Sequence, residues 1–256
     1  MREFVFLSGL PRTGSTLLSA ILSQNPKIHA EGNSPLCQLM WDVNQSLLIK
    51  CKEQLTACNR FDIIPVIMEE IPNLYYKNAI EPIIIDKCRC WTIPNNFEMI
   101  KKYISKEVKI IVLERPVVEI IQSFIKLFNK NVIYPDKWEE TIFRQGSDPI
   151  MKPLAGLMWA KNNNQNNNFL FINYDELVNN PEDTIKRIYE FCNWEYFQHD
   201  FENIVVKYPE NDKEAYNLEG QHVIRQKIGK IQNDTVLSKE VYEKCRIIDK
   251  MLGYNY

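Results

Sequence analysis

The chain has 256 residues, of which 45% are hydrophobic and 25% are charged. This composition is typical of a globular protein and excludes collagen-like, coiled-coil and wholly disordered classes. The formal net charge of −2 gives no overall basic surface for a polynucleotide or an anionic membrane, so we expect neither nucleic acid nor membrane as a partner.

Seven cysteines are scattered through the chain, and an odd number in a chain of this size does not indicate a disulfide scaffold. We therefore expect reduced thiols. Cys88 and Cys90 form a C-x-C pair, but no second pair of Cys or His lies at zinc-finger spacing. The sequence therefore predicts no metal site.

The apolar run that begins at Phe4 is too short for the core of a signal peptide, and no small-residue cleavage site follows it. No window approaches the roughly 20 apolar residues that a membrane-spanning helix needs. These two observations predict a cytoplasmic protein.

The first elements along the chain are a strand and two helices. Residues 4–7 form a short apolar run that ends in Gly9-Leu10-Pro11, which predicts a buried strand entering a turn. Apolar residues then recur at helical spacing from Leu17 to Leu22, and Asn25-Pro26 ends that pattern. A second helical stripe runs from Leu36 to Leu47.

Three further strands are predicted by β-branched or apolar runs over residues 83–85, 109–113 and 169–172. Such runs are typical of parallel strands that are buried on both faces of the sheet. After Pro116 the apolar residues from Val117 to Phe128 keep helical spacing, with the proline near the first turn. This is a second strand-turn-helix unit.

Helical patterns close the chain over residues 181–192 and 237–252, and an Asn-rich tract over 162–168 is expected to be a frayed helix end and a loop. The alternation of strands and helices predicts an α/β fold with a central parallel sheet flanked by helices. No linker or internal repeat interrupts the pattern, so we expect residues 1–256 to form a single domain.

The strongest motif is the Gly-Leu-Pro-Arg-Thr-Gly-Ser-Thr sequence of residues 9–16, between the first strand and the first helix. A glycine-bracketed turn there points backbone N–H groups into one concavity, and the helix N-terminus adds about half a positive charge, so phosphate groups bind. Compared with the Walker pattern G-x-x-x-x-G-K-[ST], Ser15 replaces the lysine and Arg12 supplies the cation. Loss of that lysine favours a donor other than a nucleoside triphosphate.

An arginine and a serine form a second element. Arg115 follows a predicted central strand, at the edge where ligands of open α/β sheets collect, and Ser123 lies about two helical turns further on. A guanidinium with a hydroxyl is a suitable pair for a phosphate monoester. The alternative is a surface arginine that pairs with Glu114 or Glu119.

These residues resemble the sulfotransferases that use 3′-phosphoadenosine 5′-phosphosulfate (PAPS), nearest the branch of tyrosylprotein sulfotransferases and their bacterial relatives. Pro11-Arg12-Thr13-Gly14-Ser15-Thr16 matches the first loop of that family, P-[RK]-[ST]-G-[ST]-[ST], at every position. Arg115 and Ser123 match its second element. The resemblance implies a sulfotransferase fold in which the first loop binds the donor, while Arg115 and Ser123 hold the 3′-phosphate that distinguishes PAPS from ATP.

Two later segments extend the resemblance. Tyr174-Asp175-Glu176-Leu177, followed by Pro181-Glu182, is similar to the family segment Y-E-x-L…P-E, which implies that Tyr174 lies near the nucleotide. The alternative is a core tyrosine at a strand end. Residues 223–230 resemble the basic, glycine-containing loop that closes over the nucleotide, and they imply Arg225 and Lys227 as phosphate contacts. A solvated charge run is the alternative for these two residues.

The resemblance implies transfer of a sulfuryl group from PAPS to a hydroxyl, or less often an amine, which leaves adenosine 3′,5′-bisphosphate. Because this group carries less negative charge than a phosphoryl dianion, cationic side chains and backbone dipoles are expected to stabilise the in-line transition state without a metal. Arg12 is expected to neutralise the departing phosphate oxygen. Lys87, at the tip of a predicted strand, matches a family lysine that contacts the transferring group.

The acceptor hydroxyl needs a general base within hydrogen-bond reach. Glu31 lies where the tyrosylprotein branch has a catalytic glutamate, in a segment of similar but not identical spacing. His29 is the rival, because other branches use histidine, and both side chains lie on one face of an extended segment. We favour Glu31. The catalytic serine that some relatives place before the late loop has no counterpart in residues 216–221, which argues against a strict tyrosylprotein assignment. A small molecule, a glycan or a peptide therefore stays open as the acceptor.

Two alternatives from other classes stay open. The first is a P-loop kinase or NTPase with a degenerate Walker A motif, in which Asp86 ends a Walker B-like strand and Thr16 reaches Mg²⁺. The second is a non-catalytic nucleotide-binding protein that keeps the fold without turnover. The sequence gives no indication of an oligomeric state.

Overall fold

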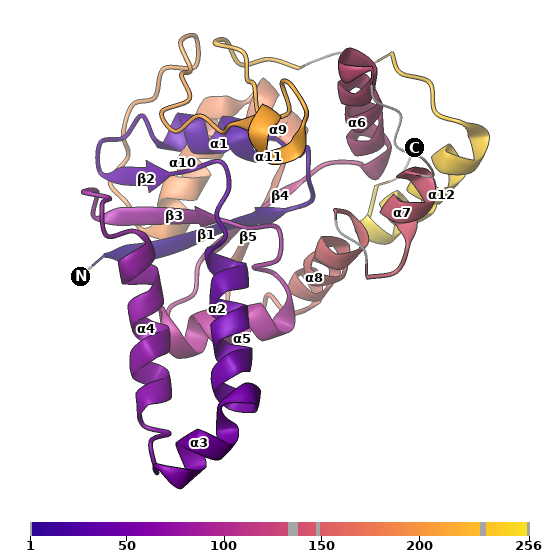
Figure 1. Cartoon of the computed structure of the whole chain (residues 1–256). Helices are drawn as coiled ribbons and strands as arrows, with labels where there is room; N and C mark the ends of the chain where they lie inside the picture. Colours follow the sequence, from indigo (N-terminus) through magenta and orange to yellow (C-terminus); the bar gives the residue numbers. More distant parts are fainter. Residues whose placement is uncertain (1, 133–137, 147–148, 231–233, 255–256) are drawn as a thin grey trace.

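The computed structural model describes residues 2–132, 138–146, 149–230 and 234–254 (Figure 1). Five strands form one parallel sheet in the order β2-β3-β1-β4-β5. The strands are β1 (Glu3–Gly9), β2 (Ile28–Ala30), β3 (Ile83–Lys87), β4 (Ile110–Glu114) and β5 (Phe169–Asn173). The predicted α/β fold with a central parallel sheet flanked by helices is therefore confirmed.

The first strand, β1, lies in the centre of the sheet, and every residue from Phe4 to Gly9 is therefore buried. At its carboxyl end, Gly9 has a φ of +135°, and a Cβ atom there would lie 2.3 Å from the carbonyl oxygen of Leu113 in β4. Only glycine permits this close approach of the two backbones. The strand can therefore turn abruptly into the loop that follows it.

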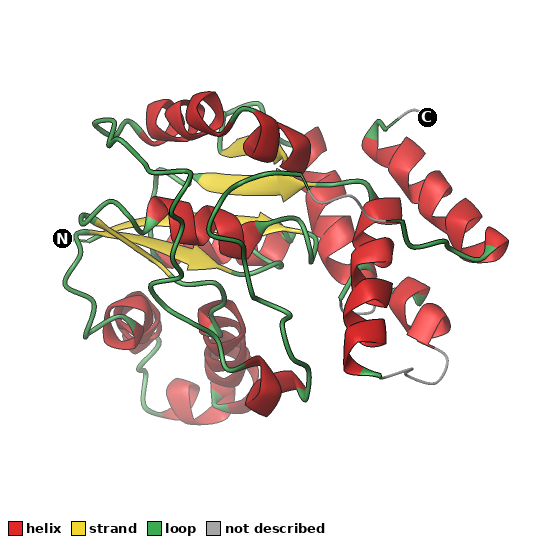
Figure 2. Cartoon of the chain, turned by 90° about the horizontal axis from the view of Figure 1, so that it is seen from above, coloured by secondary structure: helices red, strands yellow, loops and turns green. Residues whose placement is uncertain are grey.

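Helices cover both faces of the sheet (Figures 1 and 2). Val5 and Leu7 of β1 pack in one apolar cluster with α1 (Ser15–Leu22), α9 (Tyr174–Asn179) and α10 (Pro181–Cys192). Phe4 and Phe6 point to the other face, as expected from the alternation of side chains along a strand. The helices that contribute to this second cluster are α2 (Leu36–Gln45), α4 (Ile63–Tyr75), α5 (Pro94–Tyr103), α6 (Val117–Asn131), α7 (Trp138–Phe143), α8 (Met151–Asn162) and α12 (Lys239–Leu252).

The helices predicted after the first loop, after Pro116 and over 181–192 are all present as α1, α6 and α10. Pro181 occupies the first turn of α10, where a proline needs no hydrogen-bond partner. The stripe over 36–47 forms α2 and continues into a short π-helical turn, η1 (Ser46–Lys50), after which comes α3 (Lys52–Ala57). All seven cysteines are free thiols, as the sequence predicts.

The late segment, which we define as residues 200–229, has little regular structure. Its one helix is the five-residue α11 (Asp212–Tyr216), and it is otherwise held by long-range backbone hydrogen bonds. The amide of Ile204 donates to the carbonyl of Gln226 at 2.7 Å, and the amide of Ile228 donates to the carbonyl of Phe201 at 3.1 Å. These bonds fold the segment back on itself. In the described part of the chain, no helix is long and apolar enough to cross a membrane.

Candidate functional site

A cavity of about 470 Å³ lies at the carboxyl-terminal edge of the sheet. It is lined by the loops that follow β1, β3, β4 and β5 and by the late segment. Ligands of open α/β sheets bind at this edge, because the loops that leave the strands create a crevice there. We refer to this space as the donor cavity.

The loop after β1 is held in shape by two residues with positive φ, Arg12 at 62° and Gly14 at 90°. A Cβ atom on Gly14 would lie 2.9 Å from Cδ2 of Tyr174, so the tyrosine ring packs directly on the glycine. The hydroxyl of Thr13 is buried and donates to the carbonyl of Leu10 at 2.8 Å. Thr13 therefore stabilises the turn, and five other residues of the motif line the cavity: Pro11, Arg12, Gly14, Ser15 and Thr16.

The helix α1 begins at Ser15, directly after this turn, and no side chain caps its N-terminus. The first amide groups of a helix have no partner inside the helix, and they carry part of the positive end of its dipole. Because Ser15, Thr16 and Leu17 all line the donor cavity, these amides are positioned to bind an anionic group there.

The structure brings Arg115 and Ser123 to this same loop. Arg115 Nη1 donates to the carbonyl oxygen of Arg12 at 2.9 Å, and Arg12 Nε donates to Ser123 Oγ at 3.1 Å. Arg115 also pairs with Glu119 at 2.9 Å, which is the ion pair that the sequence left open as an alternative. Arg115 therefore makes the hydrogen bond to Arg12 and the ion pair with Glu119 at the same time. Within the described chain, Nη2 of Arg12 and Nη2 of Arg115 have no acceptor.

The lining of the donor cavity is strongly cationic. Six basic side chains contribute to it and, among the described residues, no carboxylate does; the six are Arg12, Lys87, Arg89, Arg115, Arg225 and Lys227. Burial and the neighbouring Arg115 lower the pKa of Arg12. The two guanidinium groups therefore repel each other, and the protein does not fully neutralise their positive charge. Such an arrangement favours an anionic ligand.

Lys87 is the last residue of β3 and is buried at the edge of the cavity. Burial, and next the charge of Arg89, lower the pKa of its ammonium group. Its position follows from the parallel sheet, because β3 pairs with β1 up to the Leu7–Lys87 position and ends beside the first loop. The side chain is therefore available to a group that is bound by that loop.

Tyr174 follows β5 and is almost fully buried between the first loop and Arg115. The guanidinium carbon of Arg115 lies 4.2 Å from the centre of the tyrosine ring, which is a cation–π contact. The ring also contributes to the lining of the donor cavity. Tyr174 thus supports both Gly14 and Arg115.

The late basic residues lie at the rim. Arg225 and Lys227 both line the donor cavity, but Lys227 is paired with Glu202 at 2.5 Å and its side chain is 70% exposed. An exposed ion pair of this kind contributes little binding energy.

The structure places His29 and Glu31 outside the lining of the donor cavity. They share one side of the chain, as predicted, with His29 Nε2 2.9 Å from Glu31 Oε1. The His29 side chain is only 8% exposed, and its Nδ1 lies 3.4 Å from Glu81 Oε2. The centre of the Tyr208 ring lies 4.4 Å from the centre of the His29 imidazole. His29 is therefore enclosed by carboxylates and aromatic rings.

Asp86, which the kinase alternative needs as a magnesium ligand, is fully buried. It accepts hydrogen bonds from the hydroxyl of Tyr76 and from Nε1 of Trp91, both at 2.7 Å. Burial raises its pKa to about 6, against the hydrogen bonds, which lower it. Because both oxygens are occupied and Asp86 is not among the lining residues, the arrangement does not support the kinase alternative.

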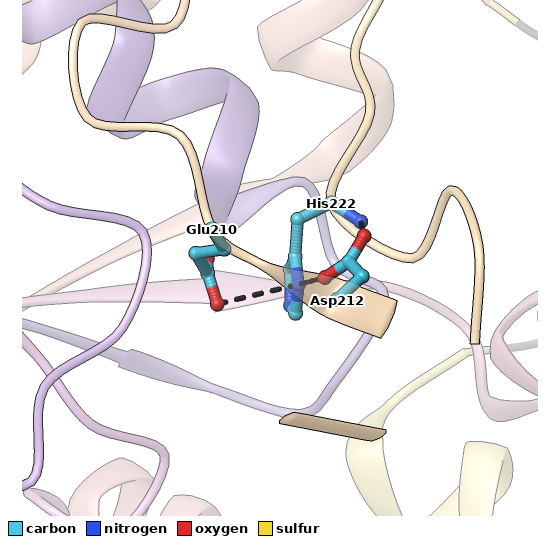
Figure 3. A group of neighbouring side chains, drawn as sticks. All are labelled: Glu210, Asp212 and His222. Atoms are coloured by element: carbon cyan, nitrogen blue, oxygen red, sulfur yellow. Dashed lines mark hydrogen bonds and ion pairs between the residues drawn. The ribbon is translucent and has the colours of Figure 1, made fainter. Parts of the chain in front are cut away.

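A cluster of Glu210, Asp212 and His222 is missing from the sequence predictions (Figure 3). His222 lines the donor cavity, and its Nδ1 lies 2.5 Å from Asp212 Oδ1 and 3.3 Å from Glu210 Oε2. Glu210 precedes α11, Asp212 is the first residue of that helix and His222 follows it, so no regular spacing marks the three in the sequence. One signal in the sequence could have led to them: His222 directly precedes the basic residues 223–230.

Comparisons with known proteins agree on one family. A sequence model described as the sulfotransferase family matches residues 5–198. A curated Caenorhabditis briggsae protein named "Putative protein-tyrosine sulfotransferase" is 24% identical over 225 residues, which cover 83% of this chain and 74% of that protein.

Two solved structures have a similar fold over the whole chain. The sulfotransferase domain from the curacin biosynthetic pathway has a TM-score of 0.57 at 14% identity, covering 100% of this chain and 99% of that chain. A sulfotransferase from Alicyclobacillus acidocaldarius has a TM-score of 0.56 at 10% identity, covering 100% and 97%.

Proposed function

The chain belongs to the sulfotransferase family, and we propose that it transfers a sulfuryl group from PAPS to a hydroxyl group of an acceptor, leaving adenosine 3′,5′-bisphosphate. The observation that carries this proposal is the donor cavity, where six basic side chains meet a glycine turn and no described carboxylate. A ligand with two separate phosphate groups has the charge that such a lining favours.

In this proposal, the first loop and the N-terminus of α1 bind the 5′-phosphosulfate group. Arg115 and Ser123 bind the 3′-phosphate, and the convergence of both on Arg12 supports this role. Apolar side chains complete the lining and offer surfaces for a planar base; they include Phe124, Phe128 and Ile228. Arg225 and Lys227 add weaker contacts at the rim.

The proposed chemistry is an in-line displacement at sulfur. Arg12 and Lys87 stabilise the charge that develops on the bridging phosphate oxygen and on the sulfuryl oxygens, because Lys87 is buried and Arg12 is partly buried at the cavity, where solvent screens a charge less than in bulk water. This stabilisation is electrostatic and needs no metal. On the acceptor side, the resemblance to the family implies Glu31 as the general base, with His29 as the alternative. The acceptor itself is a small molecule, a glycan or a peptide.

A thermal-shift titration tests the donor. Adenosine 3′,5′-bisphosphate, ADP and ATP are compared, with and without Mg²⁺, on the wild type and on Arg115→Ala. At 100 times Kd the bisphosphate stabilises the protein by about 2.7 kcal/mol, which raises the Tm by roughly 5–10 °C for a chain of this size. We expect this rise without a metal, and we expect Arg115→Ala to abolish it.

The matched control is Arg60→Ala, which removes an exposed arginine paired with Asp62 between α3 and α4. This variant should respond to the bisphosphate as the wild type does. Stabilisation by Mg·ATP alone would contradict the proposal, because it would assign the cavity to a kinase or an NTPase. Binding of the bisphosphate without transfer to any acceptor, including water, would favour the non-catalytic alternative.

A further inference from the structure

His222 lines the donor cavity, and among the described residues none forms a hydrogen bond with its Nε2. Its Nδ1 lies 2.5 Å from Asp212 Oδ1, and its backbone amide donates to Asp212 Oδ2 at 2.8 Å (Figure 3). The second carboxylate, Glu210, lies 3.3 Å from the same Nδ1. With acceptors only on this side, the neutral ring carries its proton on Nδ1 and leaves the lone pair on Nε2.

The position of His222 relates it to the groups that act on the donor. The carbonyl of the preceding residue, Gln221, accepts a hydrogen bond from Arg12 Nη1. Asp212 interacts electrostatically with Arg12, and Glu210 with Lys87. The cluster therefore adjoins both cations that are proposed to stabilise the transferring group.

Glu31 and His29 are less suited to accept the proton of an acceptor. Neither lines the donor cavity, and the nitrogens of His29 face Glu31 and Glu81. The carboxylate of Glu31 is paired with His29 at 2.9 Å. A base must reach the acceptor hydroxyl, and of the described histidines only His222 lies in the lining of the cavity.

The separation of 2.5 Å between Nδ1 and Asp212 Oδ1 is within hydrogen-bond distance. Two ligands of one zinc ion, with bonds of about 2.0–2.1 Å in tetrahedral geometry, would lie about 3.3 Å apart. The observed arrangement is therefore that of a carboxylate that orients a histidine, which leaves Nε2 available for proton transfer.

We propose that His222 is the general base of the transfer and that Asp212 is the residue that positions it; this inference rests on the proposed function. The acceptor hydroxyl gives its proton to Nε2, and the acceptor oxygen forms a bond to sulfur. The bond between sulfur and the bridging phosphate oxygen breaks, and its electron pair stays on that oxygen. The products are the sulfated acceptor and adenosine 3′,5′-bisphosphate, and the imidazolium proton then passes to water.

Several charged or titratable groups surround the cluster and contribute to its pH dependence. They are Glu210, Asp212 and Tyr216 of the late segment, Arg12 of the first loop, Glu31 after β2, and Lys87 and Arg89 at the end of β3. Because these groups include both cations and anions, a pH profile alone does not identify the group that titrates. The assignment to His222 is therefore tested by direct observation of the ring as well as by a pH profile.

The first test is His222→Asn, because an asparagine amide can still donate to Asp212 but offers no basic nitrogen. The rate measured is release of labelled sulfate from PAPS to water and to simple alcohols. We expect it to fall about 10²- to 10⁴-fold, with an unchanged thermal shift by adenosine 3′,5′-bisphosphate. The control is Glu219→Gln, an exposed residue of the same segment that pairs with Lys213, and it should retain the wild-type rate.

The second test observes the ring directly and needs no acceptor. The chain has three histidines, so nitrogen NMR of the bisphosphate complex can assign His222 as the signal that His222→Asn removes. In the neutral form of the ring we expect the proton on Nδ1. In Asp212→Asn we expect protonation to move toward Nε2, with a lower kcat, a shifted acid limb of the pH profile and a KM for PAPS within about twofold of wild type.

Three results would overturn the inference. One is a wild-type ring with its proton on Nε2. Another is loss of transfer in Glu31→Gln together with full transfer in His222→Asn, which would return the role to Glu31. The third is a rate that EDTA abolishes and Zn²⁺ restores, which would make the cluster a metal site. If the bisphosphate does not bind the wild type at all, the proposed function fails instead.

Discussion

The loop after β1 and the late segment line the same cavity, but different forces hold them in place. The loop connects a strand that is buried from Phe4 to Gly9 to a helix that is buried from Leu18 to Leu22, and Thr13 and Gly14 are fixed by the carbonyl of Leu10 and the ring of Tyr174. The late segment has only one short helix, and pairs of residues far apart in the sequence hold it. The loop is therefore held strictly by closely packed neighbours, whereas the late segment is held by a few long-range hydrogen bonds and tolerates more change.

The largest expected effect compares Gly9, the last residue of β1 before the loop, with a glycine of the late segment. In Gly9→Ala the new Cβ atom would lie 2.3 Å from the backbone oxygen of Leu113, at a φ of +135°. We expect the free energy of unfolding to fall by about 3 kcal/mol or more, because backbone strain and separation of β1 from β4 add together. Denaturant unfolding followed by circular dichroism measures this change.

The matched substitution in the late segment is Gly229→Ala. No heavy atom lies within 4 Å of the position of its added Cβ, and its φ is not in the left-handed region. We expect a change of about 0.5 kcal/mol or less, of either sign. Similar losses for both variants would show that the late segment is as strictly packed as the sheet, and the comparison would fail.

The second effect is catalytic. Arg12→Ala removes the guanidinium that lies between Ser123 and the carbonyl of Gln221, and we expect the transfer rate to fall about 10²- to 10³-fold. Arg12→Lys should not restore the rate, because one ammonium group cannot replace a planar fork that makes both contacts. Single-turnover transfer from PAPS measures both variants. A lysine variant with wild-type rate would contradict the proposed role of Arg12.

The sequence predicts the regions that local patterns control. The apolar run of β1, the glycine motif after it and the Arg115–Ser123 spacing all depend on contiguous residues, and the structure brings them together as one lining. Parallel order then follows from alternating strands and helices. The sequence predicts no helix where the structure has α3, α4, α5, α7 and α11; in α4, Pro72 lies inside the helix, where proline is unfavourable.

The part that the sequence does not predict depends on long-range contacts. Asp212 and His222 face one another within a segment whose ends are joined by the Ile204–Gln226 and Ile228–Phe201 hydrogen bonds. No period or motif marks such a fold. For the same reason, the sequence places His29 and Glu31 correctly on one face but does not indicate that His29 is enclosed by Glu81 and Tyr208.

A third effect concerns the buried Asp86, whose pKa is raised by burial to about 6. An unfolded aspartate titrates near 3.9, so the folded protein holds this proton more tightly than the unfolded chain. The stabilising contribution is complete below about pH 4 and is lost as the pH rises through 6, for a total of about 3 kcal/mol. In Asp86→Asn this part of the pH dependence should disappear.

Urea unfolding at a series of pH values from 4 to 7 measures that difference. The asparagine can still accept a hydrogen bond from Trp91 and can donate one to the hydroxyl oxygen of Tyr76, so the fold should persist. A variant whose stability follows the same pH curve as the wild type would show that another group is responsible.

The fourth effect is on donor specificity. Arg115→Lys keeps the charge but cannot make the contacts to both the Arg12 carbonyl and a phosphate that a guanidinium makes. We expect the affinity for adenosine 3′,5′-bisphosphate to fall roughly 10- to 100-fold, because the charged hydrogen bond from Nη2 to the phosphate is lost. Binding of ADP, which lacks a 3′-phosphate, should change little. Calorimetry with both nucleotides measures this, and equal losses would remove Arg115 from the 3′-phosphate site.

The smallest effect is expected at the rim. Lys227 is 70% exposed and paired with Glu202, so Lys227→Ala should weaken bisphosphate binding by about threefold or less. Because screening removes the interaction of exposed charges, the difference from wild type should vanish at about 1 M salt, whereas the loss in Arg115→Lys should persist. Calorimetric titration at low and high salt measures both variants. A large, salt-resistant loss at Lys227 would mean that the late segment closes tightly over the bound nucleotide, and the late segment would then be as strict a part of the site as the first loop.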